Sequence, residues 1–101
     1  SSWEGLVIEQ IIGILPAGWQ YFFYRSSSGA EIDLLLINDK KAPVAVEVKY
    51  SLSRQAAKGF WTSYRDLGCR KGFIVYPGNE AYPLEKDVFV LPLNNITDIV
   101  K

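Results

Sequence analysis

The sequence contains few residues that could form a disulfide bond or a zinc site. Its 101 residues include one cysteine, Cys69, and no histidine. A single thiol cannot form an internal disulfide, and protein zinc sites are built mainly from several cysteine and histidine ligands, so neither feature is expected. A metal ion bound by this chain should instead be a hard cation held by oxygen ligands.

The chain also lacks a net charge, a long apolar segment and a phosphate-binding loop. Eleven basic and eleven acidic side chains give a formal charge of zero, so any basic surface for nucleic acid must be local. No apolar run approaches the roughly 20 residues of a membrane helix and no signal peptide is visible, which favours a cytoplasmic protein without membrane contact. Without a GxxxxGK[ST] motif, we expect no nucleotide binding of that type within this chain.

Composition and periodicity predict one compact α/β domain over residues 1–101. Hydrophobic residues make up 49% of the chain, which is enough for a core. Apolar residues at a spacing of three to four over 2–15 indicate an amphipathic helix, and a second helix is expected at 53–68, from Ser53 as N-cap to Gly68 as its end. Strands are expected at 19–25, 30–38 and 43–50, within 71–79, and at 87–93. This order, α-β-β-β-α-β-β, favours a mixed sheet flanked by two helices.

Charged residues interrupt two strands that are otherwise apolar. In "PVAVEVKYS", residues 43–51, Glu47 and Lys49 share one face because side chains alternate along a strand. In "AEIDLLLIN", Asp33 precedes four consecutive apolar residues and so lies at the margin of a buried segment. A buried carboxylate without a partner costs on the order of several kcal/mol, so Asp33 needs a partner or access to water and ions. If the two strands form a hairpin, Asp33 and Glu47 face the same crevice and Lys49 points into it.

Two carboxylates and a lysine near the end of a sheet fit the hydrolysis of phosphodiesters with a divalent metal. Carboxylates hold Mg²⁺ or Mn²⁺, which polarises the phosphate and lowers the pKa of a bound water. The lysine can orient that water or offset charge in the transition state. A third carboxylate from the first helix would complete the site; Glu9 is the candidate, although Glu4 is nearby. The alternative is a solvated strand face, whose ion pairs contribute only about 0.2–1 kcal/mol.

These residues carry a resemblance to a known superfamily. Glu9, "GAEID" (29–33) and "VEVK" (46–49), followed by a helix, resemble the PD-(D/E)xK nuclease superfamily, whose shared core is αβββαβ. More closely, the chain is similar to the C-terminal domain of unknown function in a family of prokaryotic AAA+ ATPases. The segments that carry this similarity, which spans nearly the whole chain, are "GLVIEQII", "YFFYRSSSGAEIDLLL", "VAVEVKYS" and "VFVLPL".

The resemblance implies a restriction-endonuclease-like fold with a metal-dependent site for nucleic acid, DNA being favoured. Asp33, Glu47 and Glu9 would be ligands of Mg²⁺ or Mn²⁺, and Lys49 would be the catalytic lysine. Ile32 stands where the superfamily motif ordinarily has proline. The ATPase module expected upstream is absent from this chain. Because many members of the superfamily have kept the fold and lost catalysis, the resemblance leaves two functions open: a nuclease, and an inactive module that binds DNA or protein for the ATPase.

The second helix offers a separate candidate for nucleic-acid binding. On a helical wheel, Arg54, Lys58 and Arg65 fall within about 40° of one another, and Trp61 borders them. Such a basic stripe with an aromatic edge could follow a phosphate backbone or stack on a base. With a neutral net charge, a solvated helix face is the simpler interpretation. The aromatic residues of 19–24 are expected in the core rather than on a binding surface.

Overall fold

The computed structural model describes residues 2–27, 31–51 and 54–101. In chain order its elements are α1 (Trp3–Gly13), β1 (Gln20–Arg25), β2 (Glu31–Ile37), β3 (Pro43–Val48), α2 (Arg54–Asp66), β4 (Lys71–Tyr76), β5 (Tyr82–Glu85), β6 (Val88–Pro92) and the 3-10 helix η1 (Leu93–Val100). Six strands form one sheet in the order β1-β2-β3-β4-β6-β5. The pairs β3–β4 and β4–β6 are parallel and the others antiparallel, so the sheet is mixed, as the order of elements predicts.

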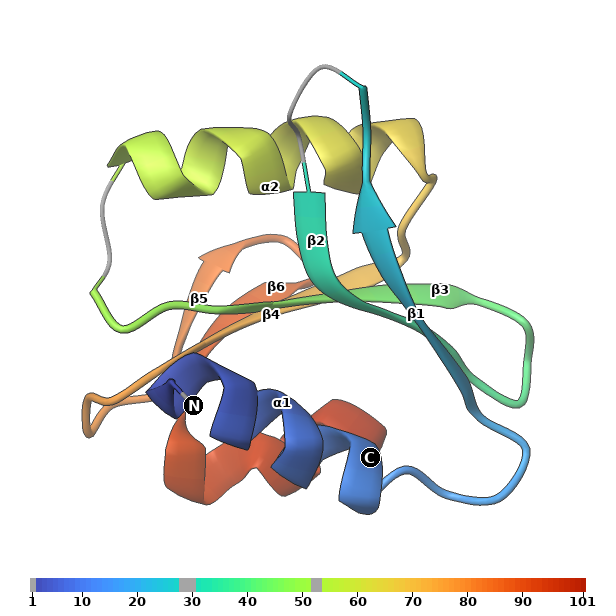
Figure 1. Cartoon of the computed structure of the whole chain (residues 1–101), viewed down its shortest axis with the longest axis horizontal. Helices are drawn as coiled ribbons and strands as arrows, with labels where there is room; N and C mark the ends of the chain where they lie inside the picture. Colours follow the sequence, from blue (N-terminus) through green and yellow to red (C-terminus); the bar gives the residue numbers. More distant parts are fainter. Residues whose placement is uncertain (1, 28–30, 52–53) are drawn as a thin grey trace.

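The helices cover opposite faces of this sheet (Figure 1). α2 lies across one face, while α1 and η1 lie together on the other. The connection from β3 through α2 to β4 joins two parallel neighbours, which is the usual way to link such strands. Both faces of the central strand β3 are therefore covered, and its residues from Val44 to Val48 are all buried. The prediction of an α/β fold with helices on both faces is confirmed.

Local signals explain where the helices begin and end. The Oγ atom of Ser2 accepts a hydrogen bond from a backbone amide in the first turn of α1 at 3.0 Å, which is an N-cap. α2 is followed by Gly68, whose φ of 63° suits glycine, and the Cys69 amide bonds back to the last turn of the helix. Gly68 is thus the end that the sequence predicts, whereas Ser53 lies outside the described residues.

In the described part of the chain, no helix is both long enough and apolar enough to cross a membrane.

The core has two parts, one on each face of the sheet. The larger part joins α1 and η1 to the sheet, and its buried members include Val7, Ile11, Val46 and Ile99. The smaller part joins α2 to the sheet, and its buried members are Ile32, Ala45, Phe60 and Val88. A Cβ atom at Gly72 would lie 3.0 Å from the Phe60 ring, so the absence of a side chain at this position of β4 lets α2 approach the sheet closely.

Two elements, β5 and η1, are additional to those expected from the sequence. The strand expected at 87–93 is β6, which ends at Pro92 and lies between β4 and β5. β5 is four exposed residues with a proline, so it has no alternating pattern that would reveal a strand. η1 holds Ile96, Ile99 and Val100 at helical spacing, but polar residues make up half of the segment and hide this signal.

The aromatic residues of β1 lie on the surface rather than in the core. Tyr21, Phe22 and Phe23 expose 45%, 49% and 68% of their surface, so the expectation of a core position is wrong for these three. Trp19 and Tyr24 are half-buried and pack against the core. β1 is an edge strand, and its pairing with β2 shifts register between Phe22 and Tyr24, which interrupts the alternation of inward and outward side chains.

Candidate functional site

Asp33 and Glu47 meet where β2 and β3 stop pairing. The two strands pair regularly from Ile37 and Pro43 as far as Leu34 and Val46. At the next position, side-chain carboxylates replace backbone carbonyls as the hydrogen-bond acceptors. The Asp33 amide donates to Oε1 of Glu47 at 3.1 Å, and the Val48 amide donates to Oδ2 of Asp33 at 2.7 Å. Each carboxylate thus accepts an amide hydrogen bond that would otherwise belong to the strand ladder.

Lys49 completes a cluster of alternating charge. Its Nζ atom lies 3.4 Å from Oε2 of Glu47, and its backbone amide donates to the Val75 carbonyl at 2.9 Å, which extends the pairing of β3 with β4 by one residue. Glu47 and Lys49 lie two positions apart on β3 and so share a face of the strand, as the alternation predicts. The structure therefore brings together Asp33, Glu47 and Lys49, three of the four residues that the sequence indicated.

Glu47 is a buried carboxylate with an unusual proton affinity. It is only 2% exposed, and burial, followed by the nearby charge of Asp33, raises its pKa from 4.5 to about 8. The charge of Lys49 acts in the opposite direction and does not compensate. A carboxyl group with such a pKa holds a proton at neutral pH, unless a cation supplies the missing positive charge.

Several carboxylates affect the pKa of Lys49. Partial burial alone would lower the pKa of its ammonium group, but the charges of Glu47, Asp33 and Glu4, with a hydrogen bond to Glu47, raise the pKa overall. Lys49 therefore remains charged at neutral pH and in contact with the acidic pair. The participation of Glu4 shows that α1 contributes a carboxylate to this end of the sheet.

The helix carboxylate near the site is Glu4, whereas the sequence favoured Glu9. Oε2 of Glu4 accepts a hydrogen bond from the Tyr50 amide at 3.0 Å, which ties the first turn of α1 to the residue after Lys49. Glu9 is exposed, and residues five positions apart on an α-helix point about 140° away from each other. The short distance between Glu4 and Glu9 in the sequence could not decide between them; only the placement of α1 does.

Replacing Glu4 by alanine should loosen the segment after β3. We expect Glu4→Ala to lower the free energy of unfolding by about 1–2 kcal/mol, because the Tyr50 amide loses a charged acceptor. Hydrogen exchange of the Tyr50 amide should become faster. Glu9→Ala, which removes the same charge from an exposed position of the same helix, should change stability by less than about 0.5 kcal/mol. Unchanged exchange at Tyr50 in the Glu4 variant would contradict this role.

The donor set suits a cation that takes few protein ligands. Mg²⁺ is commonly bound through one or two carboxylates, with water and substrate phosphate completing its shell, and Asp33 with Glu47 offers such a pair. Across residues 2–27, 31–51 and 54–101, no three Asp, Glu, His or Cys side chains lie close enough to hold one ion together. Burial, followed by the charge of Asp33, raises the pKa of Glu47, and a bound cation would act in the opposite direction by favouring the charged carboxylate. A cation bound here would therefore take no more than two of these described side chains as ligands and would complete its shell with water.

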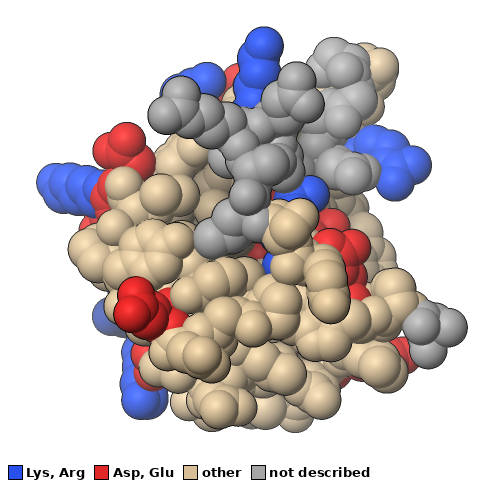
Figure 2. Space-filling model, turned by 90° about the vertical axis from the view of Figure 1, so that its left-hand side faces the viewer, with Lys and Arg blue, Asp and Glu red and all other residues tan. Residues whose placement is uncertain are grey.

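Figure 2 views the molecule from the end of the sheet where β3 finishes. Acidic and basic atoms reach the surface near the middle of this view, above an area of mostly uncharged residues. The cluster lies at the carboxyl ends of the parallel strands β3 and β4, and in open α/β sheets ligands commonly bind at these ends.

The basic stripe of α2 is only partly available for binding. Lys58 and Arg65 are exposed, so both side chains can reach a ligand. Trp61 is half-buried and makes edge contacts with two aromatic rings of its own helix at centroid distances of 5.3 and 5.8 Å. The side chain of Arg54 lies outside the described part of the chain. Trp61 thus contributes to packing and is only partly accessible to a base.

Comparisons with known proteins identify relatives of the whole chain. Over 96 residues it is 30% identical to an uncharacterized protein of Mycobacterium tuberculosis and to one of Mycobacterium bovis. Each match covers 95% of this chain and 21% of the relative, so the chain spans about a fifth of the length of these proteins.

A solved structure shares the fold. It is a chain in an assembly described as Thermococcus gammatolerans McrB AAA+ hexamers with bound McrC, with a TM-score of 0.59 and 14% identity. The match covers 90% of this chain and 27% of that chain. The family described as "Domain of unknown function (DUF4143)" matches residues 1–96, and the chain belongs to this family.

Proposed function

We propose that this chain is a metal-dependent, nuclease-like domain of the PD-(D/E)xK type that acts on nucleic acid, with DNA as the favoured substrate. The observation that carries the proposal is the convergence of Asp33, Glu47 and Lys49 where β2 and β3 separate. Acidic residues on neighbouring strands, with a lysine beside them, are the donor set that phosphodiester hydrolysis with Mg²⁺ or Mn²⁺ requires. In this proposal the mixed sheet with its flanking helices is a restriction-endonuclease-like core.

Each residue would have a separate task. Asp33 and Glu47 would hold the cation, which supplies a polarised phosphate and a water of lowered pKa when it is bound. Lys49, kept charged by its acidic neighbours, would hold the attacking water or a phosphate oxygen near Glu47. Glu4 would keep the backbone after Lys49 in place through the Tyr50 amide, which makes it a positioning residue rather than a ligand.

The domain would serve a larger protein that contains an AAA+ ATPase module. The support for this part is that the mycobacterial relatives are about five times longer than the matched segment, and that the fold recurs in an AAA+ assembly. An ATPase attached upstream could move nucleic acid past the acidic site or control access to it. A cytoplasmic location would agree with such a role.

A non-catalytic module that binds DNA or protein for the same ATPase is the second candidate. One observation favours it: the acidic pair already serves the fold. Both carboxylates accept backbone amides, and Glu47 at a pKa of about 8 is a neutral hydrogen-bonding group at neutral pH. In this alternative the acidic pair stabilises β2 and β3 where the two strands separate. Exposed basic residues such as Lys58 and Arg65 make the contacts with DNA.

Calorimetric titration with Mn²⁺ and Mg²⁺ tests the metal site. The wild type should give saturable heat, and Asp33→Asn should bind at least about tenfold more weakly, because one of two carboxylate ligands is lost. Asp66→Asn removes the same charge from the exposed end of α2 and should bind as the wild type does. Equal heats from all three proteins would refute the metal site.

Catalysis is tested separately, with single-stranded, double-stranded and branched DNA and with RNA. Metal-dependent cleavage that Lys49→Ala abolishes would support the nuclease. An absence of cleavage together with saturable metal binding would favour the non-catalytic module.

A further inference from the structure

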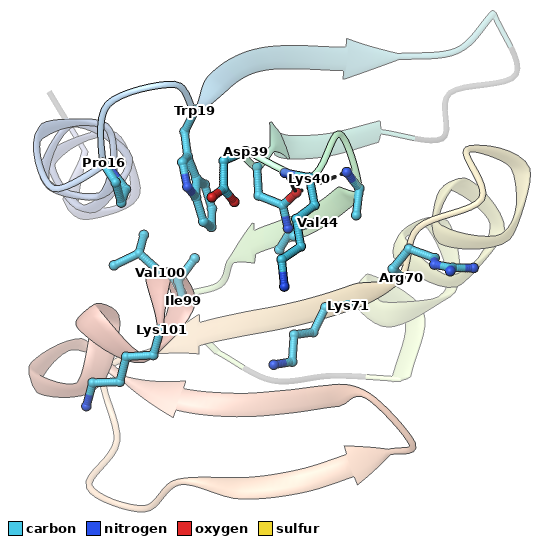
Figure 3. Close-up of a pocket in the computed structure, with 12 residues that line it drawn as sticks. Pro16, Trp19, Asp39, Lys40, Val44, Arg70, Lys71, Ile99, Val100 and Lys101 are labelled. Atoms are coloured by element: carbon cyan, nitrogen blue, oxygen red, sulfur yellow. Dashed lines mark hydrogen bonds between the residues drawn. The ribbon is translucent and has the colours of Figure 1, made fainter.

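A second polar site lies at the opposite end of the sheet from the acidic cluster. A pocket of about 490 Å³ is formed where the turn between β2 and β3, the start of β4 and the end of η1 come together (Figure 3). Its volume is within the range of small-molecule sites, about 300–1,000 Å³. Its charged lining is mostly basic: Lys40, Arg70, Lys71 and Lys101 face one acidic residue, Asp39, among the described lining residues.

The turn that carries Lys40 is held in a defined conformation. Oδ1 of Asn38 accepts hydrogen bonds from the amides of Lys40 and Ala42 at 2.9 and 3.0 Å, so one side chain closes the turn from inside. Lys41 adopts a left-handed conformation with φ of 61°, and its amide bonds to the Asn38 carbonyl at 3.0 Å. The backbone of Lys40 is therefore positioned before any ligand arrives, which reduces the entropy lost on binding.

Lys71 extends from the sheet, on the side of the pocket opposite the turn. It is the first residue of β4 and pairs in register with Val44 of β3, the central strand. Figure 3 shows the Lys40 side chain extending from the turn toward β4, where Lys71 lies, whereas the Arg70 guanidinium is directed away. Within the described part of the chain neither lysine forms an ion pair, while Lys101 is paired with Asp98 at 3.0 Å. The Nζ atom of Lys71 lies over the Phe73 ring, 6.0 Å from its centroid, a cation–π contact that leaves its N–H groups free to donate to an anion. Among the described residues, Lys40 and Lys71 are thus the lysines of this lining that pair with no carboxylate.

The rest of the pocket wall is apolar and partly aromatic. Pro16, Trp19, Val44, Ile99 and Val100 line it, and all but Pro16 are buried or half-buried. The Trp19 side chain packs against the larger part of the core and also lines the pocket, so it has a fixed place in the wall. An indole ring beside ammonium groups suits a planar ring that carries a negative group.

We propose that this pocket binds a nucleoside monophosphate, either free or as the terminal nucleotide of a nucleic-acid strand. The phosphate would lie between Lys40 and Lys71, and the base would lie against Trp19 and the aliphatic wall. The absence of a glycine-rich phosphate loop excludes one mode of nucleotide binding and not this one, because the positive charge here comes from side chains. The site is independent of the metal site, since it lies at the other end of β3.

The test measures binding to the chain in the presence of a chelator, so that failure of the metal site cannot affect it. The probes are AMP, adenosine, inorganic phosphate and a short DNA strand with or without a 5′-phosphate. We expect AMP or the phosphorylated strand to shift the indole resonance of Trp19 saturably, identified with Trp19→Phe. Lys40→Glu and Lys71→Glu should each weaken binding at least about tenfold, because a charge-assisted contact is replaced by repulsion. Lys86→Glu, an equal charge change on an exposed residue elsewhere, should leave binding unchanged.

Each outcome has a fixed meaning. Binding of AMP alone identifies a free nucleotide as the ligand, and binding of the phosphorylated strand alone identifies a strand end. The proposal is overturned if neither probe binds, if inorganic phosphate binds as tightly as AMP, or if adenosine and the unphosphorylated strand bind equally well. It is also overturned if Lys86→Glu weakens binding as much as Lys40→Glu does.

Discussion

Between about pH 5 and pH 8 the free energy of unfolding of the wild type should fall relative to that of Glu47→Gln. Burial, helped by the charge of Asp33, raises the pKa of Glu47 from 4.5 to about 8 in the folded protein. The folded protein therefore holds this proton more tightly than the unfolded chain does. The stabilisation is fully present below the unfolded pKa of 4.5 and is lost as the pH rises through about 8.

The size of this effect makes it measurable by urea unfolding with a chelator present. At about 1.36 kcal/mol per pKa unit, the loss has an upper bound of about 4–5 kcal/mol, and we expect about 2–4 kcal/mol. The pKa of Lys49 is raised from 10.5, so its own titration lies above this pH window. Glu47→Gln should be more stable than the wild type near pH 8, because a neutral amide can still accept the Asp33 amide without the burial of a charge.

A matched control separates this effect from a general change in charge. Glu85→Gln removes one negative charge from an exposed position on β5, so its stability should follow the wild type across the same pH range. Parallel curves for the wild type and Glu47→Gln would show that Glu47 does not hold a proton in the folded state. Addition of Mg²⁺ near pH 8 should stabilise the wild type and not the Glu47 variant if the carboxylates bind the ion.

Phe60→Ala should be among the most destabilising single substitutions, with a loss of about 3–5 kcal/mol. The Phe60 side chain is fully buried in the smaller part of the core and lies against the rings of Trp61 and Tyr64. It fixes α2 to the sheet, and the close approach at Gly72 means that neighbouring groups are already packed tightly around it. Alanine would leave a cavity that the backbone of β4 cannot fill.

The control for this prediction is Phe23→Ala, the same chemical change at a residue that is 68% exposed. It should alter the free energy of unfolding by less than about 0.5 kcal/mol, since little apolar surface is buried there. Chemical denaturation at one pH measures both variants. Similar losses would mean that α2 is not attached to the sheet through Phe60.

The parts of the fold that the sequence predicts correctly are those with strong local patterns. The alternation of β3 predicts that Glu47 and Lys49 share a face. The apolar run after Asp33 predicts that both faces of β2 are covered: Leu34 and Leu36 are buried, whereas Leu35 and Ile37 on the other face are only half-buried. A short turn between two such strands indicates a hairpin, which places Asp33 beside Glu47. These inferences need only the period of a strand and the cost of burying a charge.

Elements without a local pattern could not be predicted. β5 pairs with β6 although its four residues are all exposed, because its position is set by the strand beside it. The aromatic residues of β1 have the composition of a core strand, yet the edge position leaves them on the surface. The residue type indicates a preference for a buried or an exposed position, whereas the actual exposure depends on which elements cover that position in the fold.

The sequence alone determined the chemical identity of the candidate site: two carboxylates and a lysine on adjacent strands, with no cysteine or histidine cluster. The tertiary structure decided the rest. It selected Glu4 rather than Glu9, buried Glu47 beneath packed layers, and placed Lys40 and Lys71 around one pocket. These features depend on distances between segments far apart in the chain. Desolvation and charge–charge interaction depend on which groups lie close together in space. The pKa of Glu47 and the contacts of both sites are therefore properties of the folded chain.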